Sequence, residues 1–217
     1  TYPLVTDAST FADGWKNDNL NEAIWQVAMT GPDDIGNGFS YFIYNTSGVE
    51  GEDNPQYVPE DWALNLYARD DIRFQSWFDA RDITTPVVGN LTLLVKYPGN
   101  PLLYSAVTNY VNMPKVFRIS EMYLIAAEAA MGREEEVVAS KYINDLKTAR
   151  IPSWKNVDYA GDDLVLELRQ ERVRELFGEG HRLNDIKRWH IGFSRSAGQD
   201  PALMQPGENY VALKREA

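Results

Sequence analysis

The sequence predicts a mainly α-helical protein with tetratricopeptide-like helical pairs, long irregular loops and little β structure. Apolar residues recur at helical spacing through most of the chain after residue 116. Before that point, glycines and prolines interrupt the chain, most densely between residues 31 and 59. The 217 residues are 44% hydrophobic, which is enough for a packed core. We therefore expect one domain over residues 1–217, with a loop-rich, ligand-side part at 1–115 and a helical part at 116–217.

The loop-rich part contains only short predicted elements. Residues 23–28 fit either a short strand or a helical turn, because periodicity does not separate the two over so short a run. Pro59 marks the possible start of a helix, with Glu60 and Asp61 in the first turn, where the helix dipole favours acidic side chains. A second short helix is expected around residues 71–78.

Four helices are predicted in the second part. The first, at 116–131, is apolar almost all round, which is typical of a buried helix. The second opens at residues 134–136 and ends before Pro152, and together the two resemble one tetratricopeptide unit. The third and fourth are expected at 164–177 and 183–190. A generic tetratricopeptide interaction module would need several such units, and one is visible.

The densest charge pattern lies in the last two predicted helices. Glu171 and Glu175 are four residues apart, so their like charges repel unless a cation contacts both. Arg182 and Arg188 are the expected cations, because glycines in the intervening turn let the chain fold back and a guanidinium can bridge two carboxylates. The predicted structural ion network comprises Arg118, Glu121, Glu128, Glu171, Glu175, Arg182, Asp185 and Arg188.

The first predicted helix also carries charges on one face. Glu121 and Glu128 need partners from elsewhere in the chain, because an unpaired buried charge is costly. An alternative interpretation of the charge cluster is a carboxylate-dependent glycoside hydrolase, in which paired acids attack a glycosidic bond. The structural network is favoured, since every carboxylate has an arginine within one turn that would hold it ionised.

Aromatic residues concentrate in a polar, glycine-rich stretch before and at the start of the first short helix. Tyr41, Tyr44, Tyr57 and Trp62 are the candidate ligand-binding residues. Sugar rings have apolar C–H faces and polar rims, so a site for them combines flat aromatic rings with a few placed polar groups. Peptide recognition would use similar side chains. A third possibility is that these rings fill a small core beneath the loop.

Composition and motif spacing exclude several other functions. The net charge of −11 would repel DNA or RNA. The chain has no cysteine, which excludes disulfides, iron–sulfur clusters and thiolate zinc sites. Neither histidine has a second histidine at metal-ligand spacing, and the acidic turns lack the spacing of a calcium loop. No phosphate-binding loop or nucleophile elbow occurs. We therefore expect no catalytic residue, no metal and no cofactor.

Three segments of the helical part resemble motifs of the SusD/RagB family. Residues 117–129 resemble its R-x-x-E-x-Y-L-x-x-A-E-A helix, and residues 143–150 resemble its L-N-x-[VL]-[RK]-x-x-R segment. Residues 171–189 resemble its E-R-x-x-E-L-x-x-E-G-x-R-x-x-D-[LI]-x-R-W signature. Upstream, segments similar to the family's occur in the expected order at 11–18, 22–25, 57–59, 66–67, 71–73 and 96–100. The first two of these are similar to a region where the family's chain enters a strand.

The resemblance implies a SusD-like fold and a function in nutrient capture. Such a protein is a lipoprotein on the cell surface, anchored to the outer membrane of Bacteroidetes-type bacteria. It binds an oligosaccharide from starch or another polysaccharide and passes it to a SusC-like TonB-dependent transporter without catalysis. A peptide-binding, RagB-like protein on the same scaffold is the alternative. Family members are considerably longer, so we expect this chain to be a C-terminal portion whose lipid anchor lies outside it.

Overall fold

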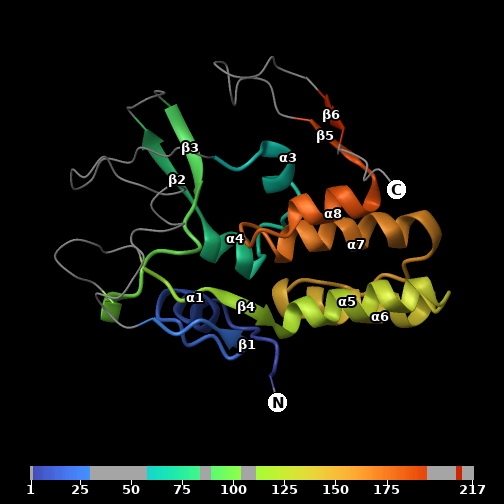
Figure 1. Cartoon of the computed structure of the whole chain (residues 1–217), viewed down its shortest axis with the longest axis horizontal. Coiled ribbons are helices and arrows are strands. Elements are labelled where there is room, and N and C mark those ends of the chain that lie inside the picture. Colours follow the sequence, from blue (N-terminus) through green and yellow to red (C-terminus); the bar gives the residue numbers. More distant parts are fainter. Residues whose placement is uncertain (1, 30–57, 84–88, 104–110, 195–208, 212–217) are drawn as a thin grey trace.

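The fold is mainly helical and has only short strands, as the sequence predicts. A computed structural model describes residues 2–29, 58–83, 89–103, 111–194 and 209–211. The strands in these ranges form three antiparallel sheets of two strands each. Figure 1 shows the long helices α5 and α6 side by side in one layer, with α7 and α8 in a layer above them. None of the helices described is long and apolar enough to span a membrane.

The main hydrophobic core lies between three helices, α5 (Ile119–Gly132), α6 (Glu136–Arg150) and α7 (Gly161–Glu175). Gly132 ends α5, and α6 follows after a short turn, so the two form the predicted helical pair. Leucine, isoleucine and alanine side chains from all three helices fill this core, and the fully buried ones are Leu124, Ala127, Ala139, Ile143 and Leu146.

The predicted start of the first long helix is wrong by three residues. Residues 115–118 instead form strand β4 (Lys115–Arg118), which pairs with β1 (Ala23–Gln26). Val116 and Phe117 are β-branched and aromatic residues, which favour an extended strand that has a partner. The ambiguous segment at 23–28 therefore contains a strand over its first four residues, and Trp25 lies opposite Phe117 in the register.

The turn after α7 places the charged residues of α8 relative to those of α7. α7 begins three residues before its predicted start, and its N-terminal turn contains Asp162 and Asp163. After it, Gly178 and Gly180 have φ angles of 72° and 83°, in the left-handed region that glycine adopts without strain. α8 (Arg182–Trp189) then starts one residue before its predicted start. The two left-handed glycines thus redirect the chain from α7 into α8 within a few residues.

A second core is aromatic and lies beside the helical pair. It brings together α1 (Ala8–Lys16) and α4 (Ile72–Trp77), whose Phe11, Trp15 and Trp77 rings have centroids 5.4–6.4 Å apart. α1 was not predicted, although the Asp7 side chain accepts a hydrogen bond from the Thr10 N–H as an N-cap. The part of residues 11–18 within α1 is helical rather than an entry into a strand.

The remaining elements are short. The helix expected from Pro59 is the single-turn α3 (Asp61–Leu64), with Glu60 at its N-cap. The hairpin of β2 (Phe78–Ile83) and β3 (Gly89–Leu94) follows α4 directly and was not predicted. A 3-10 turn and a small hairpin complete the described chain, η2 (Pro101–Leu103), β5 (Gly192–Ser194) and β6 (Asn209–Val211).

Candidate functional site

Glu175, at the end of α7, is the centre of a fully buried ion network. Its carboxylate accepts hydrogen bonds from Arg73 Nη1 at 3.0 Å, Arg118 Nη1 at 2.9 Å and Arg150 Nη2 at 2.9 Å. Burial raises the pKa of Glu175, but the three guanidinium groups outweigh this effect and hold the pKa well below its ordinary value. The carboxylate is therefore ionised and has no access to solvent.

The three arginines come from three elements and each has a second acidic partner. Arg73, in α4, donates to Glu171 Oε1 at 2.5 Å, and Arg150, at the end of α6, donates to Glu22 Oε2 at 2.7 Å. Burial raises the pKa of Glu171, but Arg174 and Arg73 lower it to about 2. The network thus joins α4, α6, α7, β4 and the segment before β1.

Glu179 extends the network through the glycine turn after α7. It accepts hydrogen bonds from Arg118 Nη2 at 2.6 Å and from Lys96 Nζ at 2.7 Å. Lys96 Nζ also lies 3.6 Å from the Trp77 ring centroid and 4.3 Å from that of Trp15. Burial lowers the pKa of Lys96 to about 7, although the Glu179 carboxylate opposes this shift. Charges and aromatic rings here form one packed unit.

The structure brings most of the predicted network residues into ion pairs, although not with the predicted partners. Arg188 pairs with Glu128, and Arg188 Nη2 lies 2.8 Å from Asp185 Oδ1. Glu121 Oε1 lies 3.6 Å from His181 Nδ1, so both acids of α5 have partners from distant segments. Among these sites, only that of Glu128 and Arg188 is substantially open to solvent.

The prediction that Arg182 and Arg188 bridge Glu171 and Glu175 is wrong. Arg73 contacts both carboxylates instead. The sequence motif could not reveal this partner, because Arg73 lies about one hundred residues away along the chain. Sequence reasoning also missed buried members of the network that belong to quoted family segments, namely Glu22, Asp71, Arg73, Lys96 and Arg150. The signal that could have found them is their place within those ordered segments.

Arg182 has a different environment from the other predicted network residues. Its guanidinium carbon lies 5.5 Å from the centroid of the Trp62 ring. Within the described ranges, no acid lies at ion-pair distance from it. Burial lowers the pKa of Arg182, Asp185 opposes this shift and Arg169 adds to it. Arg182 therefore carries a half-buried positive charge without a close carboxylate.

Trp62 and Arg182 line a pocket between α3, α7, α8 and β3, called here the Trp62 pocket. Its volume is about 420 Å³. The walls are mainly apolar and include Leu94, Leu176, Phe177 and Leu183, whereas its charged lining residues are Glu60, Arg172, Arg182 and Asp185, and His181 is a further polar one. Trp62 is 39% exposed, so part of its ring is available to a ligand. An apolar pocket with a few polar groups is typical of small-molecule sites.

Of the four predicted ligand-binding residues, Trp62 alone belongs to the described part. Tyr41, Tyr44 and Tyr57 lie outside the residues that the structure describes. Val58, which follows Tyr57 in the sequence, lines the Trp62 pocket. The structure thus places one of the four predicted residues at a pocket.

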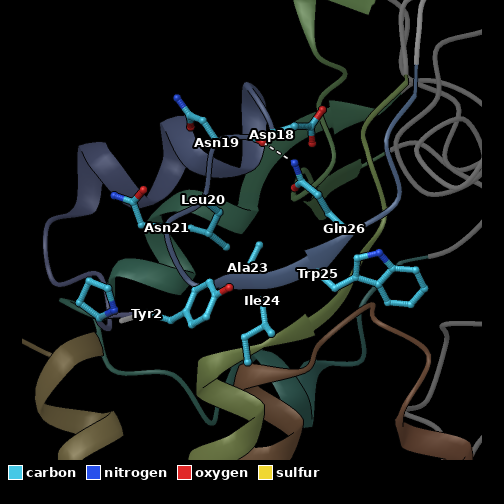
Figure 2. Close-up of a pocket in the computed structure, with 10 residues that line it drawn as sticks. Tyr2, Asp18, Asn19, Leu20, Asn21, Ala23, Ile24, Trp25 and Gln26 are labelled. Carbon is cyan, nitrogen blue, oxygen red and sulfur yellow. Dashed lines mark hydrogen bonds between the residues drawn. The ribbon is translucent and has the colours of Figure 1, made fainter.

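A second pocket, of about 530 Å³, lies along β1 and the segment before it. Figure 2 shows Tyr2, Leu20 and Ile24 around this β1 groove, with Asn19 and Asn21 on the loop that precedes the strand. Gln26 donates a hydrogen bond from its side-chain amide to the Asp18 carbonyl at 2.9 Å. Side-chain amides and aromatic rings therefore line this groove too, although the sequence did not predict a binding site here.

An exposed aromatic pair adjoins the β1 groove. Trp25 is 55% exposed and Phe117 is 47% exposed, and their ring centroids are 5.8 Å apart. Both residues belong to the two-stranded sheet of β1 and β4. The described residues contain no group of three or more histidine, aspartate or glutamate side chains that could hold a metal ion.

Comparisons with known proteins find close similarity in fold. A SusD-like carbohydrate-binding protein from Bacteroides vulgatus is 24% identical, with a TM-score of 0.66 over 90% of this chain and 40% of that protein. A SusD superfamily protein from Bacteroides thetaiotaomicron is 21% identical, with a TM-score of 0.73 over 91% and 44% of the two chains. The surface glycan-binding protein A from Bacteroides uniformis is 20% identical, with a TM-score of 0.60 over 86% and 42%.

The chain spans less than half the length of these solved structures. A search of curated proteins finds no match. The sequence profile of the SusD family matches residues 92–215, which is more than half of the chain and includes α5 to α8 with most of the ion network. This chain therefore belongs to the SusD family.

Proposed function

We propose that this chain is the C-terminal part of a cell-surface protein that binds an oligosaccharide and delivers it to a SusC-like TonB-dependent transporter. In this proposal a lipid anchor holds the whole protein at the outer membrane. The proposal rests on family membership and on the fold shared with a carbohydrate-binding protein and a surface glycan-binding protein.

The observation that carries the proposal for this chain is the Trp62 pocket. A half-exposed indole offers a flat apolar surface to the C–H face of a sugar ring, and polar groups at the rim can bind its hydroxyls. Tyr57 immediately precedes the pocket segment, and we propose that it contributes to the site together with Tyr41 and Tyr44. The ligand is then bound between α3 and the loops around it.

The chemistry of the carboxylates supports binding rather than hydrolysis. A glycoside hydrolase needs a carboxylic acid that is protonated at neutral pH and that contacts the glycosidic oxygen. Glu171 and Glu175 are fully buried, and arginines lower the pKa of both. These two acids can neither contact a substrate nor donate a proton near neutral pH. We therefore assign them to the scaffold.

Calorimetry with a panel of oligosaccharides and peptides tests this proposal. We expect the chain to bind one class of oligosaccharide, and Trp62→Ala to weaken that binding at least about tenfold, because the ring loses its contact with the sugar. Near-UV circular dichroism and thermal unfolding would verify that the variant is folded. Trp25→Ala is the matched control, since it removes an exposed indole outside the Trp62 pocket.

The two tryptophan variants also separate the alternatives. A loss of binding in Trp25→Ala alone would move the site to the β1 groove. Binding of peptides and of no oligosaccharide would contradict the sugar assignment and favour a peptide-binding protein on the same scaffold.

A further inference from the structure

Arg182 differs from the neighbouring arginines because it has no ion pair with any acid in the part of the chain that the structure describes. In the same part of the molecule, Arg172 donates to Asp185 Oδ2 at 2.9 Å, and Arg174 donates to Glu171 Oε2 at 2.7 Å. Arg188 pairs with Glu128 and Asp185. Arg182 instead has the Trp62 ring as its neighbour, at 5.5 Å.

Asp185, the acid that acts on the pKa of Arg182, is bonded to two other arginines. Asp185 raises the pKa of Arg182 from a distance, but both of its oxygens are already bonded, Oδ2 to Arg172 and Oδ1 to Arg188. Arg169, a second cation nearby, lies over the Trp189 ring at 5.3 Å and acts on Arg182 in the opposite sense to Asp185. Within the described ranges, no carboxylate therefore neutralises the Arg182 guanidinium at contact distance.

The position of Arg182 in the Trp62 pocket makes this charge available to a ligand. The guanidinium group is partly buried against apolar walls, where the attraction of an opposite charge is stronger than in bulk water. A planar guanidinium with free N–H groups can bind a carboxylate through two parallel hydrogen bonds. The adjacent indole provides the apolar surface for a ring that carries this carboxylate.

We propose that the Trp62 pocket selects acidic sugars, in which a uronic acid residue packs on Trp62 and its carboxylate binds Arg182. This inference rests on the proposed glycan-binding function and names the substrate class of that site.

Matched pairs of oligosaccharides test the inference. Each pair consists of a uronate-containing oligosaccharide and its carboxyl-reduced form, which differ only in a carboxylate or a hydroxymethyl group at the same carbon. Calorimetry would give the affinity ratio of each pair for the 217-residue chain and for Arg182→Gln. The control is Arg169→Gln, which removes another guanidinium that lies over a tryptophan but does not line the pocket.

We expect at least one acidic oligosaccharide to bind about tenfold or more tightly than its reduced form. Arg182→Gln should abolish this preference to within about threefold, while Arg169→Gln retains it. In the parent chain, added salt should weaken the binding of the acidic oligosaccharide and leave the affinity of its reduced form unchanged. The salt series requires no variant, so it tests the preference for a charged ligand even if Arg182→Gln does not fold.

Two outcomes would overturn the inference in different ways. Reduced forms that bind as tightly as the acidic ones, or an acidic preference that survives Arg182→Gln, would refute the role of Arg182 and leave the glycan-binding function standing. If neither member of any pair binds, and no oligosaccharide of the wider neutral panel binds either, the proposed function itself would be overturned.

Discussion

The buried ion network and the Trp62 pocket use the same residue types under opposite conditions. In the network, Arg73, Arg118 and Arg150 each contact at least two acids and are fully shielded from solvent. In the pocket, Arg182 contacts an indole and remains partly exposed. The two regions are connected by the glycine turn between α7 and α8, so the environment changes within a few residues.

This difference shows how one charge-rich sequence segment can serve both structure and recognition. A guanidinium bound by several carboxylates fixes the elements that carry them and has no donors left for a ligand. A guanidinium next to an aromatic ring keeps its donors available. The surroundings of each arginine, rather than the arginine itself, therefore decide which role it has.

The largest effect is expected where the network is most connected. Glu175→Gln removes the charge that balances three buried arginines, so their mutual repulsion and unmet hydrogen bonds destabilise the fold. We expect a loss of about 3–5 kcal/mol in the free energy of unfolding, measured by urea denaturation. Expression only as unfolded chain would agree with this expectation.

A matched change at the surface gives the control for Glu175→Gln. Asp145→Asn breaks an exposed pair with Lys141 on α6, and it should change the free energy of unfolding by less than about 0.5 kcal/mol. If Glu175→Gln and Asp145→Asn lowered the free energy of unfolding by similar amounts, buried and exposed ion pairs would not differ in their contribution to stability.

The pH dependence of stability should come from the same carboxylates. The pKa of Glu171 is about 2 in the folded chain, against 4.5 for an ordinary glutamate, and the pKa values of Glu175 and Glu179 are also lowered. In this range the unfolded chain binds more protons than the folded chain, so stability falls as the pH falls. The contribution is complete above pH 4.5 and is lost down to about pH 2.

Urea denaturation at a series of pH values measures this loss. The Glu171→Gln variant should be less stable at neutral pH and should show a shallower decline between pH 4.5 and 2, because it lacks one of the titrating groups. An equally steep decline in parent and variant would show that other groups govern acid unfolding.

The helical part of the fold could be predicted because its signals are local. The apolar spacing, the acidic first turns and the glycines at the end of α5 and after α7 locate helices to within a few residues. β4 could not be separated from α5 in this way, because its strand form depends on pairing with β1 about ninety residues earlier in the chain. The β2–β3 hairpin also depends on pairing that its short, mixed sequence does not indicate.

The site was less predictable because its partners are distant. The need for partners of Glu121 and Glu128 follows from their place on an apolar helix, but His181 and Arg188 could be identified only from the fold. For Arg182, the sequence predicted a partner that the fold does not provide. Its place in the charged motif suggested an ion pair, whereas the path of the glycine turn carries it to Trp62.

The smallest effect is expected at the exposed end of the charge cluster. Arg188 donates from Nη2 to Glu128 Oε2 at 2.8 Å, but both side chains are about one-third exposed. Water competes for these groups and screens the pair, so a double-mutant cycle with Glu128→Gln and Arg188→Gln should give a coupling of about 0.2–1 kcal/mol. A coupling as large as the about 3–5 kcal/mol loss expected for Glu175→Gln would mean that this exposed pair contributes as much as the buried network, so that exposure does not separate the scaffold from the surface.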